Sequence, residues 1–240
     1  MIIVRLAIVC AGFVAAIVPT RAETLSQCEA AIAPAAAIKF CSAFIDKNAR
    51  VPSDQLAAAL TLRARAHYQK RDYAAAIADF TQVIASAPKN ARAFDHRGVA
   101  HRKLGQADLA IKDHTRAIEL TPKLAKPYRN RGLAYFFKGE TESALADYGR
   151  AIERDARYAN AYNDRAAALE LSGRLTEAIV DYTTVIKLLP NSADAYNNRG
   201  YAYHQLGDRA RAIADYRKAL SLDPAQVQAR DNLQSLGADG

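Results

Sequence analysis

The chain has 240 residues, of which 50% are hydrophobic and 24% are charged. This composition is too apolar for an intrinsically disordered chain, and the length allows a sizeable core. Lys and Arg exceed Asp and Glu by 33 to 25, but both signs are interspersed, which argues against the basic runs typical of nucleic-acid binding.

The first 22 residues differ in kind from the rest. Arg5 is followed by the apolar run LAIVCAGFVAAIV and then by PTRA, which places small residues at Thr20 and Ala22. This order predicts a secretory signal peptide cleaved after Ala22, and therefore a periplasmic or secreted mature protein. The alternative is an inner-membrane anchor through residues 6–18, although that run is shorter than the roughly 20 residues needed to span a bilayer.

The next segment, 23–56, contains the two cysteines that remain after cleavage, Cys28 and Cys41. Export into an oxidising compartment predicts a disulfide between them. The alternative is a pair of small buried thiols. Pro34 lies between the cysteines and should divide the segment into two short helical pieces that fold back on each other.

From Ala57 onward the chain repeats itself every 34 residues. AYNNRGYAYHQLGDRARAIADY, which begins at Ala195, resembles PYRNRGLAYFFKGETESALADY, which begins 68 residues earlier. The units are 57–90, 91–124, 125–158, 159–192 and 193–226. The eighth place is small in Ala64, Gly98, Gly132, Ala166 and Gly200. The twentieth place is Ala76, Ala110, Ala144, Ala178 and Ala212. The twenty-fourth place is a ring in Phe80, His114, Tyr148, Tyr182 and Tyr216.

These spacings place the repeated residues on single faces of two helices per unit. The small residues should let the two helices approach closely. The turn between them is marked by Gly105, Gly139, Gly173 and Gly207, with Arg71 as the exception in the first unit. Pro88, Pro122, Pro190 and Pro224 should end the second helix.

The 34-residue helix–turn–helix pattern, with its aromatic, small, Ala and Pro places, resembles the tetratricopeptide-repeat family. The resemblance implies an all-α fold, a right-handed superhelical solenoid of antiparallel helix pairs. Residues 23–56 are then a divergent N-terminal unit, and 227–240 form a capping helix and tail, because a stack must end in a polar face.

The seventh place, which is often Leu in the family, departs from the family pattern because it is Arg in all five units, and Asp recurs equally strictly at the twenty-third place. The seventh place is Arg63, Arg97, Arg131, Arg165 and Arg199. The twenty-third place is Asp79, Asp113, Asp147, Asp181 and Asp215. Because both recur regardless of their surroundings, we expect each Arg to pair with an Asp and to support the stack. The alternative is a ladder of charge on a binding surface.

The histidines are the strongest candidates for catalysis. His67, His101 and His114 occupy places that hold core aromatic or aliphatic residues in other units, which favours packing over a metal or proton-transfer site. The sequence also contains no zinc-binding helix motif, phosphate-binding Gly loop or nucleophilic Ser elbow. We therefore predict a non-catalytic protein without a cofactor or a metal.

The resemblance also implies a concave groove, lined by the first helix of each unit, in which peptides or chain ends bind. The places that face this groove vary between units. We predict that the partner-binding residues are Arg92, Asp95, His96, Arg102, Lys126, Arg129, Asn130, Leu133, Phe136, Asn163, Asp164, Asn197, Asn198 and Tyr201. The first half of the groove should be basic and the second half acidic and rich in amides.

The function that follows is a protein–protein interaction scaffold that binds a peptide or protein partner in its groove. The Lys, Arg and Asn of the basic half partly resemble a clamp for a peptide's terminal carboxylate; the alternative is an ordinary solvated face. A second reading of the whole chain is a structural or self-associating unit of the cell envelope. Nucleic acid and a stable membrane insertion after leader cleavage are not expected among its interactions.

Overall fold

The computed structural model describes residues 25–48 and 53–238. The predicted leader, its cleavage site and the alternative anchor lie outside these residues. The described elements are helices: α1 (Leu25–Ala30), α2 (Pro34–Lys47), α3 (Ser53–Gln69), α4 (Tyr73–Ser86), α5 (Ala91–Lys103), α6 (Ala107–Leu120), α7 (Ala125–Lys138), α8 (Thr141–Arg154), α9 (Ala159–Leu171), α10 (Leu175–Leu188), α11 (Ala193–Gln205), α12 (Arg209–Leu222) and α13 (Val227–Ser235). No helix in the described ranges is long and apolar enough to cross a membrane.

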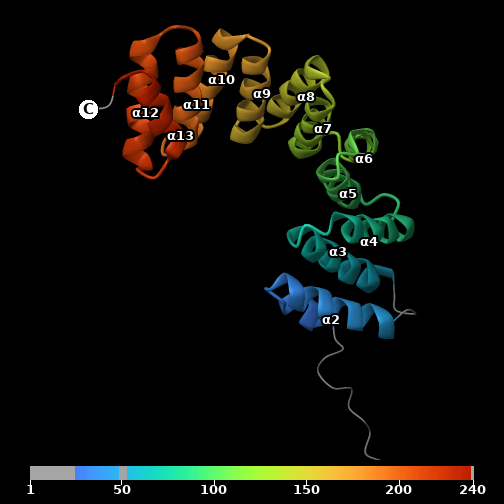
Figure 1. The fold of residues 1–240 in the computed structure, drawn as a ribbon. Coiled ribbons are helices and arrows are strands. Elements are labelled where there is room, and N and C mark those ends of the chain that lie inside the picture. The colour runs from blue at the N-terminus through green and yellow to red at the C-terminus, as the bar shows by residue number, and fades with distance from the viewer. Residues whose placement is uncertain (1–24, 49–52, 239–240) are drawn as a thin grey trace, which may run out of the picture.

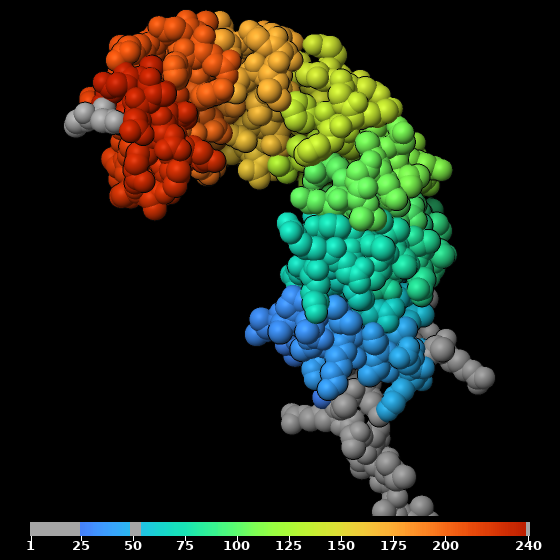
Figure 2. Space-filling view, viewed as in Figure 1, coloured from blue at the N-terminus to red at the C-terminus, as the bar shows by residue number. Residues whose placement is uncertain are grey.

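Within the described residues the helices form a stack of pairs, and each pair packs against the pairs before and after it. The stack curves into an arch with one hollowed side (Figures 1 and 2). The helices α3, α5 and α7 lie nearer the hollow than their partners α4, α6 and α8 (Figure 1). The expected all-α solenoid is therefore confirmed, with α1 and α2 at one end and α13 at the other.

The turns within the pairs use left-handed backbone, as the sequence predicts. Gly105, Gly139, Gly173 and Gly207 have φ between 73° and 86°, a region that costs other residues about 1–2 kcal/mol. Arg71 occupies the same position in the first unit with φ 64°, and it is the one non-glycine residue with positive φ in the described part of the chain. The turn geometry is thus kept even where the sequence does not supply glycine.

The core of each unit is built where a ring of the second helix meets a small residue of the first. A Cβ added to Gly132 would lie 2.7 Å from the Tyr148 ring, and one added to Gly200 would lie 2.9 Å from the Tyr216 ring. The five alanines at the twentieth place are completely buried. The two helices of a unit therefore approach as closely as their small residues allow.

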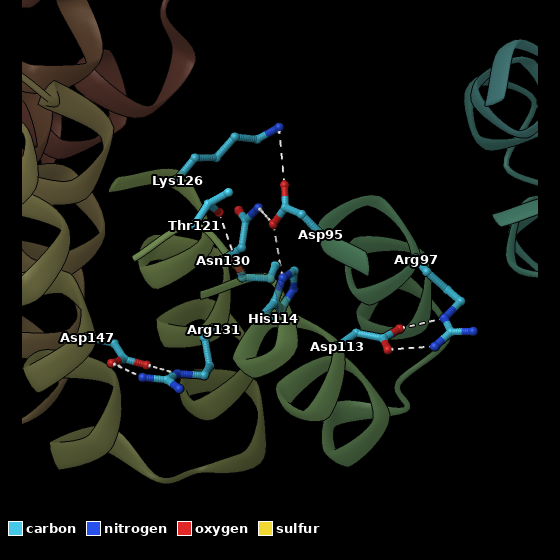
Figure 3. Close-up of polar contacts among 10 residues, drawn as sticks. Asp95, Arg97, Asp113, His114, Thr121, Lys126, Asn130, Arg131 and Asp147 are labelled. Atoms are coloured by element: carbon cyan, nitrogen blue, oxygen red, sulfur yellow. Dashed lines mark hydrogen bonds and ion pairs between the residues drawn. The ribbon is translucent and has the colours of Figure 1, made fainter. Parts of the chain in front are cut away.

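The invariant Arg and Asp residues pair within each unit. In all five units the Arg donates from Nε and Nη2 to the two oxygens of the Asp, at 2.6–2.9 Å. Figure 3 shows two of these pairs, Arg97–Asp113 and Arg131–Asp147. The structural interpretation of these residues is confirmed, since each pair ties the first helix of a unit to the second.

Four of the five arginines also contact the preceding unit. Their Nη1 atoms donate to a hydroxyl at 3.0–3.2 Å, in the pairs Arg63–Ser42, Arg97–Thr81, Arg131–Thr115 and Arg199–Thr183. Arg165 faces Gly149 instead, whose position offers no hydroxyl. The arginines therefore link neighbouring units at every joint that has a Ser or Thr.

The N-terminal segment is closed by a disulfide between Cys28 and Cys41. It joins α1 to α2 across Pro34, with the two Cα atoms 4.9 Å apart. Both cysteines are buried with Phe44 and Ala59, so the cross-link lies within the contact between this segment and α3. The predicted disulfide is present in the structure.

Candidate partner-binding groove

Three cavities follow the first helices of the stack. The basic cavity, of about 1200 Å³, lies beside α5 and α7 and includes Arg65, Lys89, Arg92, Lys123 and Lys126. The apolar cavity, of about 440 Å³, adjoins it and has walls of Tyr68, Phe80, Val99 and Leu133. The amide cavity, of about 790 Å³, lies between α9, α11 and α13. We refer to these three cavities along the first helices together as the groove.

Most of the residues predicted for the groove line these cavities. Arg92, Asp95, His96 and Lys126 line the basic cavity. Arg102, Arg129, Asn130 and Leu133 line the apolar cavity, and Asn163, Asn197, Asn198 and Tyr201 line the amide cavity. Two predicted residues line none of the three. Asp164 is engaged by Arg129 at 2.6 Å, and Phe136 packs against the hydrophobic core.

The charge of the groove changes along its length. The basic cavity contains six Lys or Arg side chains and only two carboxylates, Asp95 and Asp155. The amide cavity contains three carboxylates, Glu170, Asp194 and Asp231, and no Lys or Arg. Its remaining polar surface comes largely from asparagines. The basic and amide cavities therefore carry opposite charge.

A polar network lies beneath the basic cavity, centred on Asp95 (Figure 3). Asp95 accepts hydrogen bonds from Asn130 Nδ2 at 2.8 Å and His114 Nδ1 at 3.1 Å, and Lys126 Nζ lies 3.4 Å from its second oxygen. Burial opposes the charge, but the hydrogen bond and charge of His114, with Asn130 and Lys126, lower the pKa of Asp95 to about 2. Asp95 is thus a buried anion that holds α5, α6 and α7 together.

His114 is a core residue with an added polar role. It is fully buried, and its ring occupies the space that a Cβ at Gly98 would need. The sequence places it in the core, but its bond to Asp95 was not predicted. His67 and His101 lie near carboxylates of their own units, Asp72 and Asp113. In the described ranges no group of three or more His, Cys, Asp or Glu side chains is arranged to hold a metal.

Neighbouring first helices are also joined by what we call the inner-face ladder. In each rung the fifth place of one unit contacts the sixth place of the next, 35 residues later. The rungs are Asp95–Asn130, Arg129–Asp164, Asn163–Asn198 and Asn197–Asn232. Several residues predicted to bind a partner are therefore already engaged by the next unit, and they form the floor of the groove.

Four cations of the basic cavity were missed by the sequence prediction: Arg65, Lys89, Lys123 and Arg154, the last of which ends the second helix α8. Arg65 occupies the ninth place of the first unit, a groove-facing place that the prediction used only from the second unit onward. Lys89 and Lys123 lie in the connections between units, outside the first helices. Their common place, next to the last in each unit, was the signal that could have identified them.

The pH dependence of stability should report the Asp95 network. Because the folded pKa is below the ordinary value of 3.8, Asp95 stabilises the fold by about 2 kcal/mol above pH 4, and this contribution is lost as the pH falls through about 2. Urea unfolding across this range should give a steeper acid loss for the native chain than for Asp95→Asn. Equal slopes would contradict the prediction.

An all-helical stack of 34-residue pairs with a polar inner groove defines a helical repeat protein. Sequence comparison identifies which one. The tetratricopeptide repeat matches residues 61–125 and 129–184, and again 193–226, and a further TPR repeat matches 171–207. The chain belongs to the tetratricopeptide repeat family. Repeats of this family are generally non-catalytic and mediate protein interactions. No curated protein sequence matches the chain.

Solved structures with a similar fold include MamA, at 26% identity and a TM-score of 0.62, covering 69% of this chain and 96% of MamA. YrrB, described as a TPR protein with an unusual peptide-binding site, shares 19% identity with a TM-score of 0.61, covering 82% of this chain and 99% of YrrB. A thermophilic TPR protein from Thermus thermophilus shares 21% identity with a TM-score of 0.60, covering 75% of this chain and 98% of that protein.

Proposed function

We propose that the chain is a non-catalytic scaffold that binds a peptide or protein partner in its groove. The observation that carries this proposal is the set of three cavities along the first helices, one lined by exposed cations, one with apolar walls and one rich in amides. Polar groups at fixed positions beside apolar walls are the features from which specific binding sites are built. The description of YrrB as peptide-binding is consistent with this use of the fold.

We further propose that the protein works outside the cytoplasm after its leader is cleaved behind Ala22. The disulfide between Cys28 and Cys41 supports this location, because such bonds persist in oxidising compartments. The mass of the protein recovered from cells tests it: a mature chain beginning at Glu23 is expected, and a mass that includes residues 1–22 would favour the membrane anchor.

Site-specific photo-crosslinking in cells tests the binding site. A photoreactive residue at Arg92 or Tyr201 is expected to trap a distinct protein, because both side chains are exposed and line the groove. Arg129 is a poorer choice, because replacing it would leave Asp164 without its ion pair. Lys112 is the control: it is exposed on α6 and lines none of the three cavities.

The outcomes separate the two functions that the sequence suggests. A partner trapped from Arg92 or Tyr201 but not from Lys112 supports the scaffold. If the groove positions trap only another copy of this chain, the protein is a self-associating structural unit instead. If all three positions trap nothing, the groove is not a binding site.

A further inference from the structure

The basic cavity holds positive charge that the chain does not neutralise. Arg65, Lys89, Arg92 and Lys123 line it, and none of them has an ion-pair partner within residues 25–48 and 53–238. Of the two carboxylates in the lining, Asp95 is already bonded to His114, Asn130 and Lys126. Only Asp155 remains to offset the four cations. The cavity is therefore suited to an anionic ligand.

Cations from three different units act on one side chain of the cavity, His96. The His96 ring is stacked on the Phe80 ring. Its pKa is lowered by burial first and then by the positive charge of Lys126; Asp95 opposes this, and the smaller effects of Arg65 and Arg92 lower the pKa further. These three cations belong to α7, α3 and α5. The positive potential therefore extends over three consecutive units. An extended peptide can contact all three units at once, whereas a small ion cannot.

The apolar cavity adds a second requirement to the ligand. It shares Arg65, His96 and Lys126 with the basic cavity, so the two are continuous. Its walls and its volume of about 440 Å³ suit a bulky apolar side chain. Arg102 also lines it, and its Nε is buried with no hydrogen-bond partner among the described residues. A buried donor without a partner is costly, and a carboxylate oxygen would satisfy it.

We propose that the half of the groove formed by α3, α5 and α7 binds an extended acidic peptide segment. Its Asp and Glu side chains contact Arg65, Arg92 and Lys89, and one bulky apolar side chain between them enters the apolar cavity. This inference rests on the proposed function and specifies the partner. The carboxylates of the amide cavity repel the same segment, so they confine it to the basic half.

Fluorescence anisotropy with labelled peptides tests the proposal. The probe is a fluorescein-labelled peptide with Glu and Asp on both sides of a single Leu. One counterpart replaces every acid by its amide, and another replaces the Leu by Gly. The acidic peptide is expected to bind, with an affinity that falls as salt is added. Both counterparts are expected to bind at least several-fold more weakly.

Charge reversal in the protein provides the matched control. Arg65→Glu with Arg92→Glu is expected to weaken binding of the acidic peptide by about tenfold or more. Lys112→Glu with Lys187→Glu changes the net charge equally on exposed positions of α6 and α10, and is expected to leave binding nearly unchanged. Circular dichroism establishes that both variants fold.

Each result distinguishes this inference from the proposed function. If the amide counterpart binds as tightly as the acidic peptide, or if both double variants bind alike, the groove accepts peptides but the acidic class is wrong. If no peptide binds while crosslinking from the groove still traps a protein, the scaffold function is supported and the inference of an acidic segment is wrong. If neither peptide nor trapped partner is found, both proposals fail.

Discussion

Arg131→Leu is expected to lower the free energy of unfolding by about 3–5 kcal/mol, because it leaves the Asp147 carboxylate buried without its main partner. The Asp147 side chain is 0% exposed and accepts two hydrogen bonds from Arg131, at 2.6 and 2.8 Å. Urea denaturation followed by circular dichroism measures the loss.

Two variants distinguish the buried pair from a general effect of charge. Arg150 contacts the same carboxylate at 2.7 Å, but its side chain is 52% exposed, so Arg150→Leu should cost about 1 kcal/mol or less. Arg131→Leu combined with Asp147→Leu should recover part of the lost stability, since no unpaired buried charge remains. Equal losses from the two arginines, or no recovery in the double variant, would contradict the assignment.

Tyr148→Ala should cost about 3–5 kcal/mol by opening a cavity in the third unit. Tyr148 is 1% exposed and belongs to the largest buried cluster, with Leu145, Leu169 and Tyr182. The ring lies directly on Gly132, where an added Cβ would approach it to 2.7 Å. Thermal and urea unfolding of the variant measure the effect.

The contact with Gly132 predicts that the two sites are coupled. In the native chain Gly132→Ala should destabilise by about 1–3 kcal/mol through overpacking. In the Tyr148→Ala background the same substitution should cost clearly less, since the ring is gone and only the Ala144 backbone oxygen, at 3.2 Å, remains close to the added Cβ, while Ala is the better helix former by about 1 kcal/mol. Gly149→Ala is the control. Its Cβ would meet nothing closer than Arg165 at 3.9 Å, so it should stabilise in both backgrounds. An equal loss from Gly132→Ala in both backgrounds would refute the contact with the ring.

The features that the sequence predicted well are those with one residue type in a fixed phase. The Arg–Asp pairs are an example, because identical residues recur in all five units and their contact lies within one unit. The close approach of Tyr148 to Gly132 is another, since a small residue at the eighth place of each unit leaves room for the ring at the twenty-fourth place. Contacts that lie within one unit and recur in all five units can therefore be predicted from the residue types alone.

The inner-face ladder could not be predicted in the same way. Its rungs use different chemistry, an ion pair in Arg129–Asp164 and amide contacts in Asn163–Asn198, so only polarity is preserved. Its partners also belong to adjacent units, and their contact depends on how far each unit is rotated against the next. That rotation is set by the whole interface between units and not by any short stretch of sequence.

The joint between the third and fourth units differs from the others, because Gly149 offers no hydroxyl to Arg165. The first helices at this joint are joined by the ion pair Arg129–Asp164. A second ion pair across the joint, Arg174–Glu142, is exposed and adds little to its stability. In mechanical terms this joint has one cross-link fewer than the four joints with a Ser or Thr, so elastic bending of the arch is expected to concentrate between α8 and α9. Such bending would change the distance between the basic and amide cavities.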